Sequence, residues 1–425
     1  MTPAKKILVI SNNCLSLHNS NGRTLLNLLG GIDKDDIFQI YFSGETPSEE
    51  TAGAFVRVTN GDVIKSFMSV KNRFPVVTAT PETKTENKSS SGKKNARNML
   101  IRDRVYRLSI RAKKTLFKRV KDFKPDVILL QLGDSALLID YALYISDKLG
   151  AKIITYNTED YYFKDYDYMA QSEKPSITYK FFHKRFVKYF DRLMKRKPFC
   201  IYNCEGLKEL YDEKFDAKSE VIYNSSDIDL SANPQKNERK KTDGITYAGN
   251  LGVGRHKVLI EIGKAIKEID ESLSLSVYGA APENIIETEL KNAEGINYCG
   301  FIPYRDVVDV MLKSKLLVHV ESFDDYYKVD TKYAFSTKIA DCCASKVPIF
   351  ICAPAGCEAF RYLSKNDSAF CCSDKDYIKD TIKTALYDEK ERKEKSDNAL
   401  KIFNENHNYR KNGEKFVELL NRLNR

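Results

Sequence analysis

Short apolar runs alternate with longer segments of helical periodicity, and this alternation most constrains how the chain can fold. In the first half, runs at 6–11, 37–43 and 126–133 predict strands, and 136–150 has the spacing of an amphipathic helix. The second half repeats the alternation from residue 244 onward. Strands that alternate with helices of this length build a parallel sheet covered on both faces. The sequence therefore predicts an α/β protein with two doubly wound, Rossmann-like domains.

A polar segment at 225–244, with Pro, Asn and a run of charges, separates the two alternations and is typical of a linker. The 425 residues also exceed the size at which one core stops growing. We expect an N-terminal domain over 1–224, a C-terminal domain over 225–406, and a last helix at about 407–425 that returns to the first domain. Ligands of such sheets are expected in a cleft between the domains, at the strand ends.

Two segments of the first half have unusual composition. Residues 78–98 contain no aromatic side chain and are rich in Thr, Ser, Lys and Asn, so we expect a mobile loop followed by a basic helix at about 99–123. The excess of a net charge of +10 lies in 93–124 and 180–197, where basic residues interleave with aromatic and aliphatic ones. Helices on an anionic membrane surface and solvated faces of ordinary packed helices both fit this pattern. Nucleic acid is the poorer choice, because no recognition motif accompanies the charge.

The sequence favours a cytoplasmic protein, with peripheral attachment to the inner membrane face as an open alternative. No run approaches the roughly 20 apolar residues that span a bilayer, and the apolar stretch near the N-terminus is only about five residues long, too short for a signal peptide. Ten cysteines and five histidines give no zinc-ligand spacing. Asp165 and Asp167, like Asp227 and Asp229, have D-x-D spacing, but both pairs lie in polar stretches, so no metal site is predicted.

The segment 244–266 predicts a strand, a glycine-bearing turn and a helix that opens with basic residues. Asn250 lies in the turn, and Arg255 and Lys257 lie at the helix start. Backbone N–H groups, the positive end of a helix dipole and fixed cations together suit a diphosphate. An ordinary structural turn is the alternative.

Two later strands end on a glycine before a loop, at Gly279 and before Phe301 and Ile302. An apolar turn such as the second can hold a nucleobase by backbone hydrogen bonds and flat packing. Taken on its own, the motif favours an ordinary strand-to-helix turn.

A helix predicted at 336–345 begins with Ser336 and Thr337, whose N–H groups are suited to a phosphate. Lys338 and Asp341 share one face of this helix, and Asp341 is placed to reach a ribose. In the alternative interpretation Ser336 only caps the helix, and Lys338 and Asp341 form a surface pair.

With these motifs the second half resembles glycosyltransferase family 4 and its relatives, whose GT-B fold has two Rossmann-like domains that face each other across a cleft. The turn before the basic helix resembles the family's phosphate-binding turn, with Arg255 as the matching arginine and Lys257 one or more positions off the usual lysine. Asp341 matches the second of the family's two acids, which holds the ribose. Tyr333 stands where the first acid, which contacts the donor sugar, would be.

The resemblance extends to the first half. SNGRT (20–24) resembles the family's glycine loop after the first strand, which implies that Gly22 faces the donor phosphate. TYNTEDYY (155–162) occupies the place of acceptor-side residues, so Glu159 and Asp160 are candidates to polarise an acceptor hydroxyl. A helix start is the alternative explanation of these two acids.

The resemblance implies retaining, metal-independent transfer of a sugar from a nucleoside-diphosphate sugar, expected to be UDP-linked, with no cofactor. Arg255, a nearby lysine and helix N-termini would stabilise the departing diphosphate. The expected acceptor is a glycan or lipid-linked glycan, as in surface polysaccharide synthesis. Two other classes stay open: a nucleotide-sugar epimerase, and a non-catalytic partner subunit of the same fold that binds a membrane or another transferase.

Overall fold

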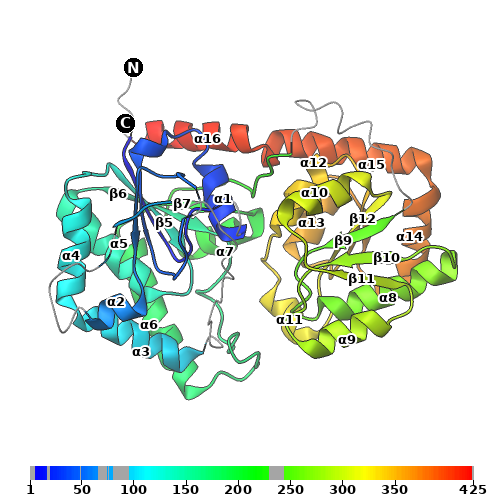
Figure 1. Cartoon of the computed structure of the whole chain (residues 1–425), viewed down its shortest axis with the longest axis horizontal. Coiled ribbons are helices and arrows are strands. Elements are labelled where there is room, and N and C mark those ends of the chain that lie inside the picture. Colours follow the sequence, from blue (N-terminus) through cyan, green and yellow to red (C-terminus); the bar gives the residue numbers. More distant parts are fainter. Residues whose placement is uncertain are drawn as a thin grey trace. The chain divides into compact units, whose positions relative to one another are not determined.

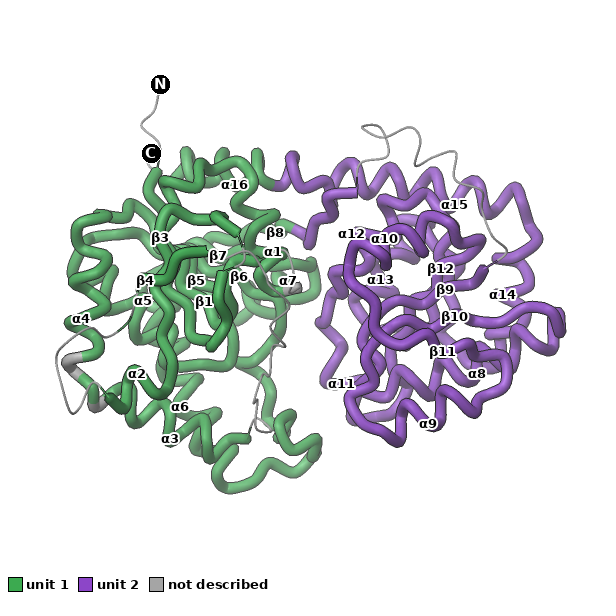
Figure 2. Tube along the Cα trace, viewed as in Figure 1, with its two compact units in different colours: residues 1–222, 413–425 green, residues 223–412 purple. Residues whose placement is uncertain are grey.

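The structure is a computed structural model in which two compact units are described (Figures 1 and 2). Unit 1 comprises residues 1–222 and 413–425, and unit 2 comprises residues 223–412. The residues that the structure describes are 5–16, 20–47, 49–65, 74, 76–79, 95–228 and 244–423. Most of the predicted loop at 78–98 and of the predicted linker at 225–244 therefore lies outside the described residues.

Unit 1 is built on an eight-stranded sheet in the order β4-β3-β2-β1-β5-β6-β7-β8. Every neighbouring pair is parallel except β3 and β4. The strands β1, β2 and β5 are buried along their whole length, as expected for a sheet with helices on both faces. The strands are β1 (Ile7–Ser11), β2 (Ile37–Tyr41), β3 (Ala54–Arg57), β4 (Val76–Val77), β5 (Val127–Leu132), β6 (Lys152–Asn157), β7 (Phe199–Tyr202) and β8 (Ser219–Val221).

The helices of unit 1 follow the predicted alternation with one break. The helix expected at about 99–123 is two helices that meet at Ser109, whose hydroxyl accepts a hydrogen bond from the Ala112 N–H at 3.1 Å. A serine side chain that caps a helix start offers the backbone an alternative to continuing the preceding helix. The helices are α1 (Ser20–Leu28), α2 (Asn60–Lys65), α3 (Ala96–Leu108), α4 (Ile110–Val120), α5 (Ala136–Leu149), α6 (Ile177–Met194) and α7 (Glu205–Lys214).

Unit 2 has a six-stranded, all-parallel sheet in the order β11-β10-β9-β12-β13-β14. The chain builds outward from β9 in one direction and then resumes at β12 on its other side. This reversal between β9 and β12 is the topological switch point, outside which doubly wound sheets bind their ligands. The strands are β9 (Ile245–Ala248), β10 (Leu275–Tyr278), β11 (Ile296–Gly300), β12 (Leu316–Val320), β13 (Ile349–Cys352) and β14 (Phe370–Cys372).

The helices of unit 2 cover its sheet, and the last helix of the chain leaves the unit. Phe416, Leu419 and Leu420 of this last helix are buried in the core of unit 1 with Ile7 and Val9. No helix among the described residues combines the length and apolar character needed to cross a bilayer. The helices are α8 (Arg255–Ile269), α9 (Asn284–Asn292), α10 (Tyr304–Lys313), α11 (Asp325–Asp330), α12 (Thr337–Ala344), α13 (Glu358–Lys365), α14 (Ile378–Tyr387), α15 (Glu389–Ile402) and α16 (Tyr409–Arg422).

Helix α8 packs closely against the turn before β11 through a glycine in its interior. A Cβ atom at Gly263 would lie 2.8 Å from the Glu294 carbonyl oxygen and 2.7 Å from Cδ1 of Ile296. Glycine in a helix interior costs about 1 kcal/mol relative to alanine, so local propensity alone would disfavour it here. The backbone contact with the turn explains why a residue without a Cβ occupies this position.

We expect Gly263→Ala to destabilise the protein although alanine is the better helix former. The clash with a backbone carbonyl should outweigh the gain in propensity, for a net loss of about 1–2 kcal/mol. Urea unfolding followed by circular dichroism measures the change. Gly356→Ala is the control, because a Cβ there has no atom within 4 Å. A Gly263→Ala variant more stable than the wild type would contradict this packing.

Candidate functional site

The residues predicted to bind the donor lie on the loops at the carboxyl ends of the unit 2 strands. Backbone hydrogen bonds join these loops: the Gly249 N–H donates to the Tyr278 carbonyl at 3.0 Å, and the Gly279 N–H donates to the Gly300 carbonyl at 2.9 Å. A Cβ at Gly279 would lie 2.2 Å from the Gly249 carbonyl oxygen. The loops after β9, β10 and β11 are therefore held together at one edge of the sheet, and Gly279 permits their close approach.

The glycine turn after β9 is stabilised from within. Asn250 is exposed, and its side-chain oxygen accepts the Gly252 N–H at 2.8 Å, while the buried Tyr247 hydroxyl donates to the Asn250 carbonyl at 2.6 Å. Gly254 has a φ of +75° and caps α8. A Cβ at Gly254 would lie 2.4 Å from Oγ of Ser322, so glycine lets the start of α8 approach the loop after β12.

Arg255, the first residue of α8, forms a two-pronged ion pair with Glu321, which directly follows β12. Its Nε lies 2.9 Å from Oε2 and its Nη2 lies 3.0 Å from Oε1 of that carboxylate. The Arg255 side chain is only 13% exposed and that of Glu321 only 1%. The pair spans β9 and β12, the two strands that flank the switch point.

Glu321 is charged despite its burial. Burial alone would raise the pKa of its carboxyl, but Arg255 and, to a smaller extent, His319 lower the pKa below the ordinary value. The Nε2 atom of His319 lies 3.5 Å from Oε1 of Glu321. The sequence analysis did not select Glu321. Its position directly after a buried apolar strand is the sequence signal that could have identified it.

Lys257 also has a carboxylate partner, because its Nζ lies 2.8 Å from Oδ2 of Asp324. Both side chains of this pair are largely solvent-exposed. The predicted cations at the start of α8 are thus each matched by an acid from the loop after β12. The backbone N–H groups of Arg255 and Lys257 donate to the Gly252 and Gly254 carbonyls, each at 3.3 Å, so an anion at this helix start would meet chiefly the outer N–H groups of the Arg255 side chain.

The second predicted group lies at the start of α12. Ser336 is the N-cap, with its Oγ accepting the Lys338 N–H at 3.3 Å, and Thr337 is the first helical residue. The Nζ of Lys338 lies 3.7 Å from Oδ2 of Asp341, and the Asp341 side chain is only 1% exposed. The predicted pair therefore forms, but its acid is buried instead of lying on the surface.

Tyr304, which the sequence analysis did not single out, is the link between α10 and α12. Its hydroxyl donates to Oδ1 of Asp341 at 2.8 Å, and the Lys338 Nζ lies 4.8 Å from the centre of its ring. The turn just before it carries Phe301, whose side chain is 74% exposed, and the half-buried Ile302. The exposed Phe301 ring thus lies in the turn before α10, and the first residue of α10, Tyr304, contacts the buried Asp341 of α12.

Gly22, Glu159 and Asp160 are the site residues predicted in the first half of the chain. Gly22 was expected in a loop, and this is wrong: Gly22 is buried inside α1, which begins at Ser20. Helical contacts of the apolar residues that follow, including the buried Leu25 and Leu28, extend the helix back over the glycine. Gly22 is therefore part of a helix start, where it has no role as a flexible loop residue.

Asp160 has a structural role in the loop after β6. Its Oδ1 accepts the N–H groups of Tyr162 at 3.0 Å and Phe163 at 3.1 Å, and the Tyr211 hydroxyl at 2.7 Å. Burial and the Asp160 carboxylate raise the pKa of Tyr211 well above its ordinary value. Neither acid begins a helix, and Glu159 is the exposed member of the pair.

Of the two D-x-D pairs, the structure describes Asp165, Asp167 and Asp227. Both carboxylate oxygens of Asp167 accept local hydrogen bonds, from the Ala170 N–H and the Ser176 hydroxyl. Asp229 lies outside the described residues. Among the residues that are described, no group of three or more His, Cys, Asp or Glu side chains is placed to hold an ion.

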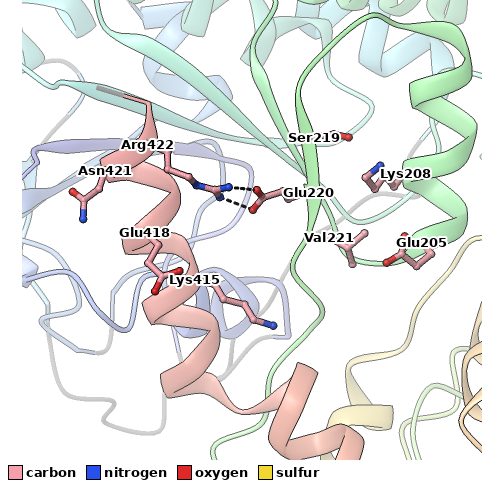
Figure 3. Close-up of a pocket in the computed structure, with 9 residues that line it drawn as sticks. All are labelled: Glu205, Lys208, Ser219, Glu220, Val221, Lys415, Glu418, Asn421 and Arg422. Atoms are coloured by element: carbon pink, nitrogen blue, oxygen red, sulfur yellow. Dashed lines mark hydrogen bonds and ion pairs between the residues drawn. The ribbon is translucent and has the colours of Figure 1, made fainter. Parts of the chain in front are cut away.

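A pocket of about 720 Å³ lies in unit 1 (Figure 3). It is lined by α7, β8 and α16. Arg422 forms two ion-pair contacts with Glu220 (Figure 3). Lys208 pairs with Asp212 at 2.6 Å. No predicted site residue lines this pocket.

The contrast between the two acids after β6 is testable. Asp160→Ala should destabilise the protein by about 1–3 kcal/mol, because two backbone N–H groups and the buried Tyr211 hydroxyl lose their acceptor. Glu159→Ala is the matched control and should change stability by less than about 0.5 kcal/mol. Thermal unfolding of both variants checks this. Equal midpoints for the two would refute the structural role of Asp160.

Comparisons with known proteins bear on the fold that carries this site. Residues 257–418, less than half of the chain, match a family model described as glycosyl transferase-like. No curated protein matches the sequence significantly. The matched residues include Asp341 and begin just after Arg255.

Three solved structures are similar over nearly their whole length. HepE from Anabaena in complex with UDP has 13% identity and a TM-score of 0.66, over 98% of this chain and 99% of that chain. The α,α-trehalose 6-phosphate synthase from Burkholderia multivorans has 12% identity and a TM-score of 0.62, over 99% and 97%. The UDP-forming α,α-trehalose-phosphate synthase from Burkholderia xenovorans, in complex with glucose-6-phosphate, has 11% and 0.60, over 98% and 100%. The chain therefore has the GT-B fold, with two doubly wound α/β units as the sequence predicts.

Proposed function

We propose that this protein is a glycosyltransferase that moves a sugar from a nucleoside-diphosphate sugar to a glycan or lipid-linked glycan. The observation that carries the proposal is Arg255, fixed by Glu321 at the switch point of the unit 2 sheet in a GT-B fold. A glycosyl transferase-like sequence over 257–418 supports it.

The proposed donor is UDP-linked and is held by three sets of residues. The base packs on Phe301 and Ile302, the ribose hydroxyls bind the Asp341 carboxylate, and the diphosphate binds at the start of α8. The HepE structure in complex with UDP-glucose supports a uridine nucleotide, because its fold is the same. Asp341 reaches the ribose only when the Tyr304 hydroxyl, which now donates to it, shares or yields that oxygen.

The proposed reaction proceeds with retention and without a metal ion. The bond between the anomeric carbon and the diphosphate oxygen breaks, and its electron pair stays on the diphosphate. The acceptor oxygen bonds to the anomeric carbon on the same face, and its proton passes to the departing diphosphate. Arg255 stabilises the developing charge through Nη1, because Nε and Nη2 face Glu321, and the N-terminus of α8 adds its dipole.

The proposed acceptor site lies at the loop after β6. Glu159 is the exposed acid after β6 and is our candidate to orient an acceptor hydroxyl, since Asp160 is engaged in its own turn. Surface polysaccharide synthesis in the cytoplasm, at the inner membrane face, would supply both a nucleotide sugar and a lipid-linked acceptor. Product analysis with a panel of UDP-sugars and lipid-linked glycans tests the acceptor, and the anomeric configuration of the product tests retention.

A non-catalytic partner subunit is the second candidate, and two observations favour it. Tyr333 occupies the place of the acid that contacts the donor sugar, and Glu321 balances the charge of Arg255. Such a subunit would bind no donor or would bind it without turnover. An epimerase would instead convert a nucleotide sugar in the absence of any acceptor, so incubation without acceptor distinguishes it.

We expect Arg255→Ala to lower turnover by roughly two to three orders of magnitude, the scale for loss of one charge-stabilising donor. The same change leaves the buried Glu321 carboxylate without its arginine, which costs about 3–5 kcal/mol of stability. A double variant, Arg255→Gln with Glu321→Gln, removes both charges and keeps the fold. Steady-state rates of all three proteins are the measurement.

The double variant separates catalysis from folding. If it is as stable as the wild type and turns over at a near-normal rate, Arg255 has no catalytic role. Lys257→Ala is the comparison within the same helix turn, and we expect a smaller loss because its ammonium is solvent-exposed and already paired with Asp324.

We expect Asp341→Ala to weaken binding of UDP by about 1–3 kcal/mol, because a ribose hydroxyl loses its acceptor. Isothermal titration calorimetry with free UDP gives the affinity. Asp380→Ala, which removes an exposed acid from α14, is the control and should leave it unchanged. Unaltered UDP affinity in a folded Asp341→Ala protein would count against the proposed ribose contact.

A further inference from the structure

Helices α2, α3 and α6 form one packed layer of unit 1 (Figure 1). Tyr179 and Phe182 of α6 are buried with Ala96 and Met99 of α3 in a small core of their own. An ion pair with an Nε–Oδ2 distance of 3.1 Å links Arg185 on α6 to Asp103 on α3. Helix α2 adjoins α3, where the Tyr106 hydroxyl donates to Oδ1 of Asn60 at 3.1 Å. These contacts determine which sides of the three helices are exposed to solvent.

Large apolar side chains lie on the solvent side of this layer. Ile177 is 76% exposed and Phe181 is 64% exposed, one turn apart on α6. Ile101 on α3 is 52% exposed, and Ile64 on α2 is 53% exposed. Single exposed apolar residues are ordinary on a protein surface, but these four come from one helix layer. The layer therefore presents more apolar surface to water than an ordinary solvated helix face.

The charged side chains exposed on α3 and α6 all carry the same sign. Both acids of these helices are engaged: Asp103 is buried against Arg185, and Asp191 accepts the Tyr162 hydroxyl at 2.8 Å. The exposed charged residues of the two helices are Arg97, Arg104, Arg107, Lys180, Lys184, Lys188 and Arg192. An ordinary solvated helix face mixes the two signs, as α15 does with its Glu and Lys residues.

We propose that this face, defined by α2, α3 and α6, docks on an anionic lipid bilayer. Its bases attract the anionic headgroups, and each basic residue close to such a surface strengthens binding roughly fivefold. The exposed Ile and Phe side chains enter the boundary between headgroups and acyl chains. A nucleic acid would use the bases but gain little from exposed isoleucines, so a bilayer accounts for both features. The inference does not depend on the proposed transfer reaction.

Vesicle flotation with the full chain tests the proposal. Vesicles of equal parts phosphatidylcholine and phosphatidylglycerol should carry the protein upward, and pure phosphatidylcholine vesicles should not. High salt should weaken this binding but leave the apolar contribution in place. Exchanging Lys180, Lys184 and Lys188 for Gln should weaken binding by roughly 10- to 100-fold. Ile177→Ser with Phe181→Ser should weaken it at every salt concentration.

Matched controls lie in unit 2. Ile285→Ser removes a side chain that is 62% exposed on α9, among the acids Glu283 and Glu287, and should leave binding unchanged. Exchanging the exposed Lys383, Lys390 and Lys393 for Gln removes the same net charge elsewhere and should cost far less. Equal losses in the two lysine triples would show that net charge alone drives binding and would overturn the proposed face.

Two further outcomes would overturn the proposal. The first is flotation with phosphatidylcholine vesicles as strong as with the anionic ones. The second is a homodimer in light scattering that Phe181→Ser dissociates, which would make a second copy of the chain the occupant of this face. Binding of UDP by the Ile177 and Phe181 variants, measured by calorimetry, should match the wild type and keeps this test separate from that of the proposed function.

Discussion

The ion pair between Arg255 and Glu321 joins the two strands from which the unit 2 sheet grows in opposite directions. Both side chains are buried, so their desolvation is offset only while the two charges stay in contact. The contact sets the position of the first turn of α8 above the sheet edge. For α8 to start this close to the loop after β12, Gly254 adopts a left-handed backbone conformation. Gly279 lacks a Cβ, which lets the loop after β10 contact the Gly249 carbonyl in the loop after β9. The buried pair thus ties the start of α8 to the loop after β12, while backbone hydrogen bonds join the loops after β9, β10 and β11.

The same pair decides how much positive charge the site offers to an anion. A lone arginine at a helix start would present a full charge, whereas Arg255 presents its outer N–H groups with the charge largely balanced by Glu321. The N–H groups and dipole at the start of α8 then carry more of the attraction. A site of this kind gains most from charge that develops during a reaction, because its donors are fixed in place beforehand. In the proposed transfer, such donors would act on the departing diphosphate more than on the bound sugar nucleotide.

Local sequence patterns predict most of the unit 2 strands and the starts of α8, α10 and α12, because apolar runs, glycine turns and a serine cap are encoded within a few residues. The partners of the site are not local. Glu321 reaches Arg255 from 66 positions away and Tyr304 reaches Asp341 from 37, so no spacing rule pairs them. The strands β3, β4 and β14 were not expected, although β14 is no shorter than the expected β8. The sequence analysis began the first helix at the apolar residues after Gly22, whereas α1 begins at Ser20 and contains Gly22.

The basic segment at 180–197 shows how one pattern can satisfy two interpretations at once. Phe182, Phe186 and Phe190 of α6 are buried, as an ordinary packed helix requires. Phe181 and Ile177 lie on the opposite side among lysines, as a membrane-facing helix requires. Helical periodicity alone could not separate these sets, because both recur at three- or four-residue intervals. The packing of α6 separates the two sets: Phe182 is buried against α3, and Phe190 packs against Tyr162, Tyr211 and Phe215.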